Sequence, residues 1–179
     1  MNESCREIAC CFSGHRAEKL PWHYNETAPE CIELKALIGE MLRDAYDAGF
    51  RRFYCGMATG ADMYFGEAVA ALRCEHPDVV LEAVIPYRGQ ERRWPKAQRM
   101  RYAQLKAQCD AVTVLHEAYC RGCMQERNRY MVDRSSLLLA VYDERSGGTL
   151  NTVRYAERQR ITVVVLPVRG LKSGQNKAT

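Results

Sequence analysis

The sequence predicts an α/β protein: a three-layer sandwich in which a mostly parallel sheet of about six strands carries helices on both faces. Short apolar runs of strand length alternate strictly with longer segments of helical periodicity along the 179 residues. Such alternation is typical of βαβ units, whose right-handed crossovers lay parallel strands side by side and cover both faces of the sheet. The length suits one domain, which we expect to span residues 1–168, followed by a flexible polar tail at 169–179.

Six runs of five to seven residues have the composition of strands, and the first of them reads as a short buried strand. They are short, apolar and mostly rich in β-branched or aromatic residues, and turn residues or helical segments bound them. In chain order they read EIACCF, RRFYC, VVLEAVI, AVTVL, LLLAVY and ITVVVL, at residues 7–12, 51–55, 79–85, 111–115, 137–142 and 161–166.

The segments between these runs have helical spacing of apolar residues. The first ends at Gly49, and the second ends before Pro77. Pro95 stands in the first turn of the third, where the missing N–H costs nothing. The expected helices are residues 30–48, 61–75, 95–108, 123–134 and 149–159.

Composition excludes several classes of protein. No apolar run approaches the roughly 20 residues that cross a bilayer, and the first residues, MNESCREIACCF, lack the apolar core of a signal peptide. The nine cysteines are dispersed, and their odd number favours free thiols in a reducing compartment. We therefore expect a cytoplasmic protein without a membrane partner. We expect no metal, because His116, Cys120 and Cys123 have zinc-like spacing but no evident fourth ligand.

Charge is unevenly distributed, although the formal net charge is only +4. Residues 1–50 hold nine acidic and five basic side chains, whereas residues 88–134 hold eleven basic and five acidic ones. A basic segment indicates an anionic partner or, equally, a solvated helix face.

The turn after the first strand carries polar and cationic groups. Gly14 allows a close approach to the backbone, Ser13 can donate to a phosphate or ribose, and Arg16 can pair with an anion. His15 is either an acid–base group or a structural part of the turn. Ligands of open parallel sheets bind beyond the carboxyl ends of the strands, which is where this turn lies.

A second glycine-rich turn follows the second strand and opens a helix. It contains Gly56 and Gly60, and Thr59 and Asp62 have the spacing of a capping box. Free N–H groups at a helix start suit a phosphate, and Asp62 can bind a ribose hydroxyl. The alternative is a tight turn without a ligand.

Further candidates follow the later strands. Gly147, Gly148 and Thr149 open the last helix, and Arg127 and Asn128 stand at the edge of the expected cleft. Tyr87 and Trp94 flank arginines and could stack a base, or Trp94 could instead pack at the start of a helix. Several such turns along one sheet edge predict a cleft for a phosphate or a nucleotide.

Five stretches together resemble the YpsA-like family of the SLOG superfamily. They are CCFSGHRAEKLP, CGMATGADMYFGEAV, IPYRGQERRW, CMQERNRYMVDRSSLLLAVYD and SGGTLNTVRYA, and the resemblance runs from Ile8 to Pro167. It implies a Rossmann-like form of the sandwich, shared with the DNA-processing protein DprA and with LOG phosphoribohydrolases. It also implies links to bacterial cell division or stress and leaves self-association open.

The resemblance assigns roles residue by residue. The family's Gly-His-Arg falls on Gly14, His15 and Arg16, and its Gly-Ala-Asp falls on Gly60, Ala61 and Asp62. The catalytic arginine of LOG enzymes falls on Arg127, but their catalytic glutamate falls on Thr152.

Three functions stay open on this basis. The first is binding of a nucleotide or nucleotide-derived ligand, ADP-ribose-like, in sensing or regulation. The second is cleavage of an N-glycosidic bond, with catalytic candidates Arg127, Glu126 and Asp133. The third is DprA-like binding of single-stranded DNA, favoured by the basic segment.

Overall fold

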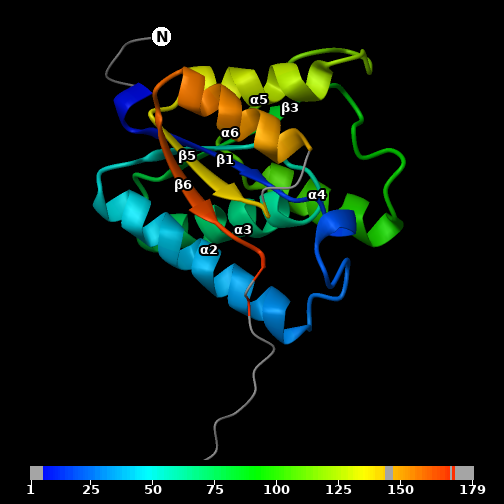
Figure 1. Ribbon diagram of the computed structural model, residues 1–179. Helices are drawn as coiled ribbons and strands as arrows, with labels where there is room; N and C mark the ends of the chain where they lie inside the picture. The colour runs from blue at the N-terminus through cyan, green and yellow to red at the C-terminus, as the bar shows by residue number, and fades with distance from the viewer. Residues whose placement is uncertain (1–5, 144–146, 170, 172–179) are drawn as a thin grey trace, which may run out of the picture.

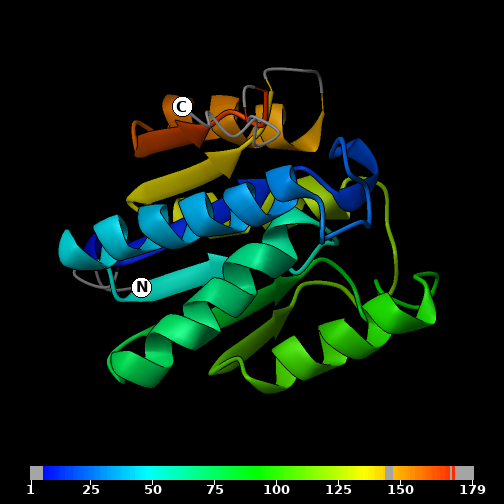
Figure 2. The same cartoon turned by 90° about the horizontal axis from the view of Figure 1, so that it is seen from below.

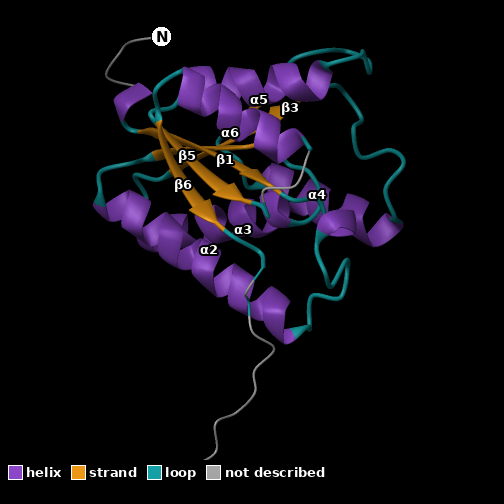
Figure 3. Ribbon diagram, viewed as in Figure 1, coloured by secondary structure: helices purple, strands orange, loops and turns teal. Residues whose placement is uncertain are grey.

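A six-stranded, fully parallel sheet forms the centre of the molecule, as Figure 3 shows in orange. We describe it from a computed structural model, which covers residues 6–143, 147–169 and 171. The spatial order is β4-β3-β2-β1-β5-β6. The strands are β1 (Ala9–Gly14), β2 (Arg52–Cys55), β3 (Val80–Ile85), β4 (Ala111–Val114), β5 (Leu137–Val141) and β6 (Thr162–Leu166).

Helices cover both faces of the sheet, which confirms the predicted three-layer α/β sandwich (Figures 1 and 2). One core cluster joins the sheet to α2, α3 and α4, and a second joins the opposite face to α5 and α6. The helices are α2 (Pro29–Asp47), α3 (Ala61–Glu75), α4 (Lys96–Ala107), α5 (Cys123–Asp133) and α6 (Gly148–Arg158), with a short 3-10 helix, η1 (Ala17–Lys19). Among the described residues, no helix is both long and apolar enough to cross a bilayer.

The order of the strands creates a topological switch beside β1. The chain runs outward from β1 to β4 and then returns to place β5 on the other side of β1. The loops after β1 and β5 therefore diverge toward opposite faces, and a crevice opens between them at the carboxyl ends of the strands.

The expected elements match the observed ones within about two residues, and the largest shift concerns β1. It spans Ala9–Gly14 instead of residues 7–12. Ser13 and Gly14 continue the strand because they pair with Ala140 and Val141 of β5. Both residues were expected in the turn after the first strand, and they are instead the last two residues of β1. The predicted tail at 169–179 lies outside the described residues except for Arg169 and Leu171.

Two glycines should respond oppositely to replacement by alanine. Gly60 has φ +87°, and a Cβ there would lie 2.5 Å from the backbone nitrogen of Ala17, whereas Gly39 lies within α2 with space around it. Gly60→Ala should lower the free energy of unfolding by about 2 kcal/mol or more. Gly39→Ala should raise it by about 0.5–1 kcal/mol because the helix gains backbone stability. Chemical denaturation measures both, and equal effects would contradict this account of the α3 start.

Candidate functional site

A small cavity lies at the switch point, where the carboxyl ends of β1 and β5 meet the starts of three helices. Its volume is about 130 Å³. A cavity of this size suits a phosphate group. The residues around it are Phe12, Ser13, Gly14, His15, Arg16, Lys19, Ala58, Asp62, Met124, Arg127, Asn128, Gly148 and Thr149.

Asp62 organises one wall of this cavity. Its carboxylate is buried, with the residue 4% exposed. Oδ1 accepts the backbone N–H of Gly14, and Oδ2 accepts that of Ala58, each at 3.2 Å. Asp62 thus ties the end of β1 to the β2–α3 loop.

The predicted capping box at the start of α3 is wrong. The N-cap is Gly60, and no side chain caps the helix. The positive φ of Gly60 turns the chain, which leaves the Asp62 carboxylate free to bond the two loop amides instead. Thr59 is buried but does not line the cavity.

Arg127 lies opposite Asp62 and is equally buried, at 5% exposure. Its Nη1 is 3.7 Å from Asp62 Oδ2, and neither its Nε nor its Nη1 has a hydrogen-bond partner among the described residues. Gly56 makes room for the guanidinium, because a Cβ at this position would overlap it. A buried guanidinium with unused donors is costly, and acceptors on a ligand would relieve that cost.

Burial shifts the titration of both groups. Desolvation raises the pKa of the Asp62 carboxyl, and the Arg127 charge and the Ala58 and Gly14 amides oppose the rise. Desolvation likewise lowers the pKa of the Arg127 guanidinium, and the Asp62 charge opposes the fall. Each group is therefore the main local support for the charge of the other.

His15 links the two strands that flank the cavity. Its backbone N–H donates to Val141, and its ring Nε2 accepts the N–H of Asp143 at 3.2 Å. The ring is buried and meets Tyr142 edge-on. These contacts favour the structural role that the sequence left open, although His15 also borders the cavity.

The first turn of α6 closes the opposite side. Gly148 and Thr149 line the cavity, and Gly147 precedes them with Lys19 of η1 close to its backbone. Free N–H groups at the start of this 11-residue helix suit a negative charge.

Sequence reasoning missed several residues of the site. Lys19 reaches the cavity only because η1 folds back over α6, and no spacing in the sequence signals that contact. Met124 lines the cavity, and its sulfur lies 3.7 Å from Arg16 Nη2. Phe12 and Ala58 complete the wall from neighbouring strand ends.

Other candidates lie apart from the cavity. Tyr87 packs edge-on against Tyr119 in a separate pocket, and Trp94 packs against Tyr102, which favours its structural interpretation. Glu126 pairs with His116 at 2.6 Å. Asp133, at the end of α5, accepts the hydroxyl of Tyr155.

Polar contacts join α5 to α6 beside the cavity. Asn128 Nδ2 donates to Thr152 Oγ1 at 2.6 Å, and that hydroxyl donates to the carbonyl of Gly148. Among the described residues that line the switch-point cavity, Asp62 carries the one carboxylate. In the same part of the chain, no group of three or more His, Cys, Asp or Glu residues is placed to hold a metal ion.

Curated relatives are bacterial proteins of low identity. The chain is 27% identical to a UPF0398 protein of Staphylococcus haemolyticus over 70% of this chain and 68% of the relative. The chain is 25% identical to a UPF0398 protein of Staphylococcus epidermidis, over 68% of this chain and 65% of the relative. It is 29% identical to the SPbeta prophage-derived protein YoqJ of Bacillus subtilis, over 60% and 70%. The chain thus spans about two thirds of the staphylococcal relatives it matches.

Two solved structures of DprA share the fold. The Helicobacter pylori protein, described for its single-stranded DNA binding mode, has a TM-score of 0.61 at 16% identity, over 96% of this chain and 72% of that one. The Streptococcus pneumoniae protein has a TM-score of 0.55 at 18% identity, over 90% and 50%. At the level of sequence, the model of the YspA SLOG family matches residues 10–163, and the chain therefore belongs to that family.

Proposed function

We propose that this protein binds a nucleotide or nucleotide-derived ligand, ADP-ribose-like, with a phosphate in the switch-point cavity, and acts in sensing or regulation. The observation that carries the proposal is Arg127, whose buried guanidinium keeps Nε and Nη1 without hydrogen-bond partners beside that cavity. Oxygens of a bound phosphate ligand would accept these unused N–H groups and neutralise part of the buried charge.

The charges around the cavity favour an anion. Arg16, Lys19 and Arg127 line it together with the single carboxylate of Asp62. That carboxylate already accepts two backbone N–H groups, which disperses its charge toward the protein. The start of α6 adds free amides on the far side. The net field is therefore attractive for a phosphate.

The arrangement supports binding over cleavage of an N-glycosidic bond. Glu126 and Asp133 are engaged elsewhere and do not line the cavity. Thr152 occupies the position at which LOG enzymes carry their glutamate and bonds Asn128 and Gly148. A hydrolase would need an acid or base at the glycosidic bond, and among the described lining residues only Asp62 and His15 could supply one.

Arg127 should dominate the affinity for nucleotides. Arg127→Lys retains the charge but loses the planar array of donors, and Arg127→Met loses both. In calorimetric titrations with AMP, ADP and ADP-ribose, each variant should weaken binding at least about tenfold. Arg99→Gln on α4 removes one exposed charge on the opposite face and should match the wild type. The proposal would be refuted if the wild-type protein bound none of the three ligands. It would also be refuted if the Arg127 variants bound them as tightly as the wild type.

Gly56 offers an independent test of the same geometry. Its φ lies outside the left-handed range, but an added Cβ would displace the Arg127 guanidinium and lie 2.9 Å from Asp62 Oδ2. Gly56→Ala should reduce nucleotide affinity at least about tenfold while the protein stays folded. Thermal melting checks the fold and calorimetry checks the affinity. Full affinity in a folded Gly56→Ala protein would show that the position of Arg127 is irrelevant to binding.

Binding of single-stranded DNA is the second candidate, and the reported binding mode of the H. pylori DprA favours it. The strand would follow the cationic rim formed by Arg16 and Lys19. Binding of a labelled oligothymidine should then be measurable at low salt and should fall steeply as salt rises, because phosphate contacts release counterions. Absence of a mobility shift at low salt would eliminate this candidate.

A further inference from the structure

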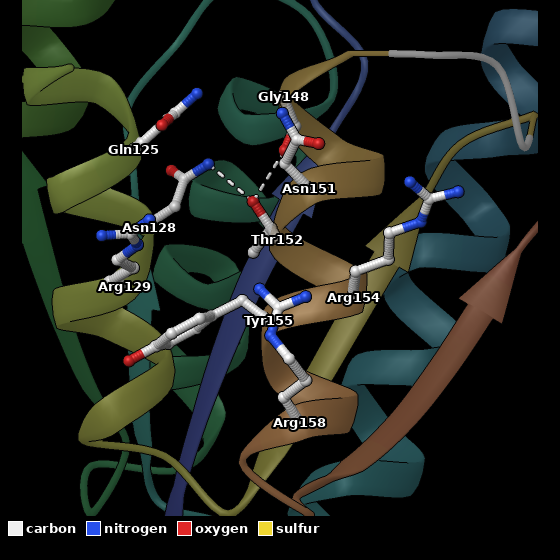
Figure 4. Close-up of a pocket in the computed structure, with 9 residues that line it drawn as sticks. All are labelled: Gln125, Asn128, Arg129, Gly148, Asn151, Thr152, Arg154, Tyr155 and Arg158. Carbon is white, nitrogen blue, oxygen red and sulfur yellow. Dashed lines mark hydrogen bonds between the residues drawn. The ribbon is translucent and has the colours of Figure 1, made fainter.

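A second, larger cavity opens between α5 and α6, on the outer side of these helices (Figure 4). Its volume is about 320 Å³, and it shares Asn128 and Gly148 with the switch-point cavity. We call it the α5–α6 groove. It is formed by Gln125, Asn128, Arg129, Gly148, Asn151, Thr152, Arg154, Tyr155 and Arg158.

The groove gathers more positive than negative charge: three arginines border it, and Asp133, which accepts the Tyr155 hydroxyl, lies beside it. The arginines are Arg129, Arg154 and Arg158, and none of the residues that line the groove is acidic. Within residues 6–143, 147–169 and 171, none of the three arginines forms an ion pair. Like charges held on neighbouring helices repel one another, and a bound anion would offset that repulsion.

Two of the arginines converge on the aromatic ring at the centre of the groove. The guanidinium carbon of Arg129 is 5.5 Å from the centre of the Tyr155 ring, and that of Arg158 is 5.8 Å from it. Figure 4 shows Arg158 folded back across Tyr155 toward α5, whereas Arg154 leans away from α5. Cation–π contact with the ring thus holds Arg129 and Arg158 near each other although both carry positive charge.

Polar donors continue the groove toward the switch-point cavity. Asn128 and Thr152 form its floor, where they bond each other and the Gly148 carbonyl. Above this floor, the side-chain amides of Gln125 and Asn151 have no hydrogen-bond partner among the described residues. Amide and guanidinium N–H groups are the donors that phosphate oxygens accept.

We propose that the α5–α6 groove is a second anion subsite, which takes the additional phosphate of a nucleotide that carries more than one. This inference rests on the proposed function in one respect: the phosphate in the groove would belong to the same ligand as the phosphate in the switch-point cavity, and the two cavities share Asn128 and Gly148. The groove thereby distinguishes a diphosphate from a monophosphate.

The groove fits a small molecule better than a nucleic-acid strand. Proteins that bind single strands offer exposed aromatic faces on which bases stack. Here Arg129 and Arg158 already lie over Tyr155, so its ring is not a free platform. The volume also falls within the range of small-molecule sites, about 300–1,000 Å³.

The test compares ADP with AMP by calorimetry. Arg129→Gln/Arg158→Gln should weaken ADP binding at least about tenfold and change AMP binding less than about twofold, because only the second phosphate reaches the groove. Lys96→Gln/Arg99→Gln on α4 removes the same charge from the opposite face and should leave both affinities unchanged. An unchanged preference for ADP in the groove variant would overturn the proposal. Thermal melting verifies folding, and Arg158→Gln alone should give a smaller effect in the same direction.

Inorganic pyrophosphate separates this inference from the proposed function. It should bind the Arg127→Met protein through the groove and lose at least about tenfold in affinity when Arg129 and Arg158 are also replaced. That result would support the groove even if no nucleotide depended on Arg127. The groove proposal would be overturned if pyrophosphate bound neither the Arg127→Met protein nor the wild-type protein. Loss of oligothymidine binding in the groove variant without any effect on ADP would also overturn it, since the groove would then hold a strand.

Discussion

The opposition of two buried charges, Asp62 and Arg127, is the constraint around which the crevice is built. Removing a carboxylate and a guanidinium from water costs several kcal/mol for each ion. The protein recovers part of that cost through the amides of Gly14 and Ala58, and part through the 3.7 Å approach of the two charges. Direct contact would have consumed the donors of Arg127. The observed separation leaves them unused, and that residual imbalance makes the crevice receptive to an anion.

The positions of strands and helices were predictable because local pattern and tertiary role agree. The four inner strands, β1, β2, β3 and β5, are mostly buried, so they read as apolar runs, and the helices cover one face each, so they read as periodic segments. The start of α3 was not predictable in detail. Thr59 and Asp62 have the spacing of a cap, but a non-local partner, the Gly14 amide, takes the carboxylate. Here Gly60 supplies the turn that begins α3, so the Asp62 carboxylate forms a long-range hydrogen bond to Gly14 instead of a local capping bond.

The cavity itself was only partly predictable. Ser13, Gly14, Arg127 and Thr149 were assigned to a ligand site from the rule that parallel sheets bind at their carboxyl edge, and they do line one cavity. Tyr87 lies on the same edge but beyond β2, where it contacts Tyr119 instead. Lys19 lines the cavity because η1 lies beside the start of α6, and Met124 does so because the first turn of α5 meets Arg16. Contacts of that kind leave no periodic pattern in a sequence.

Arg127 and Arg129 are two positions apart on α5, so their side chains leave the helix in nearly opposite directions. One points inward to Asp62, and the other borders the outer groove. A single rigid cylinder therefore carries one wall of each compartment. Any rotation of α5 about its own axis displaces both guanidinium groups at once. A ligand in the switch-point cavity that turned α5 would therefore change the shape of the α5–α6 groove.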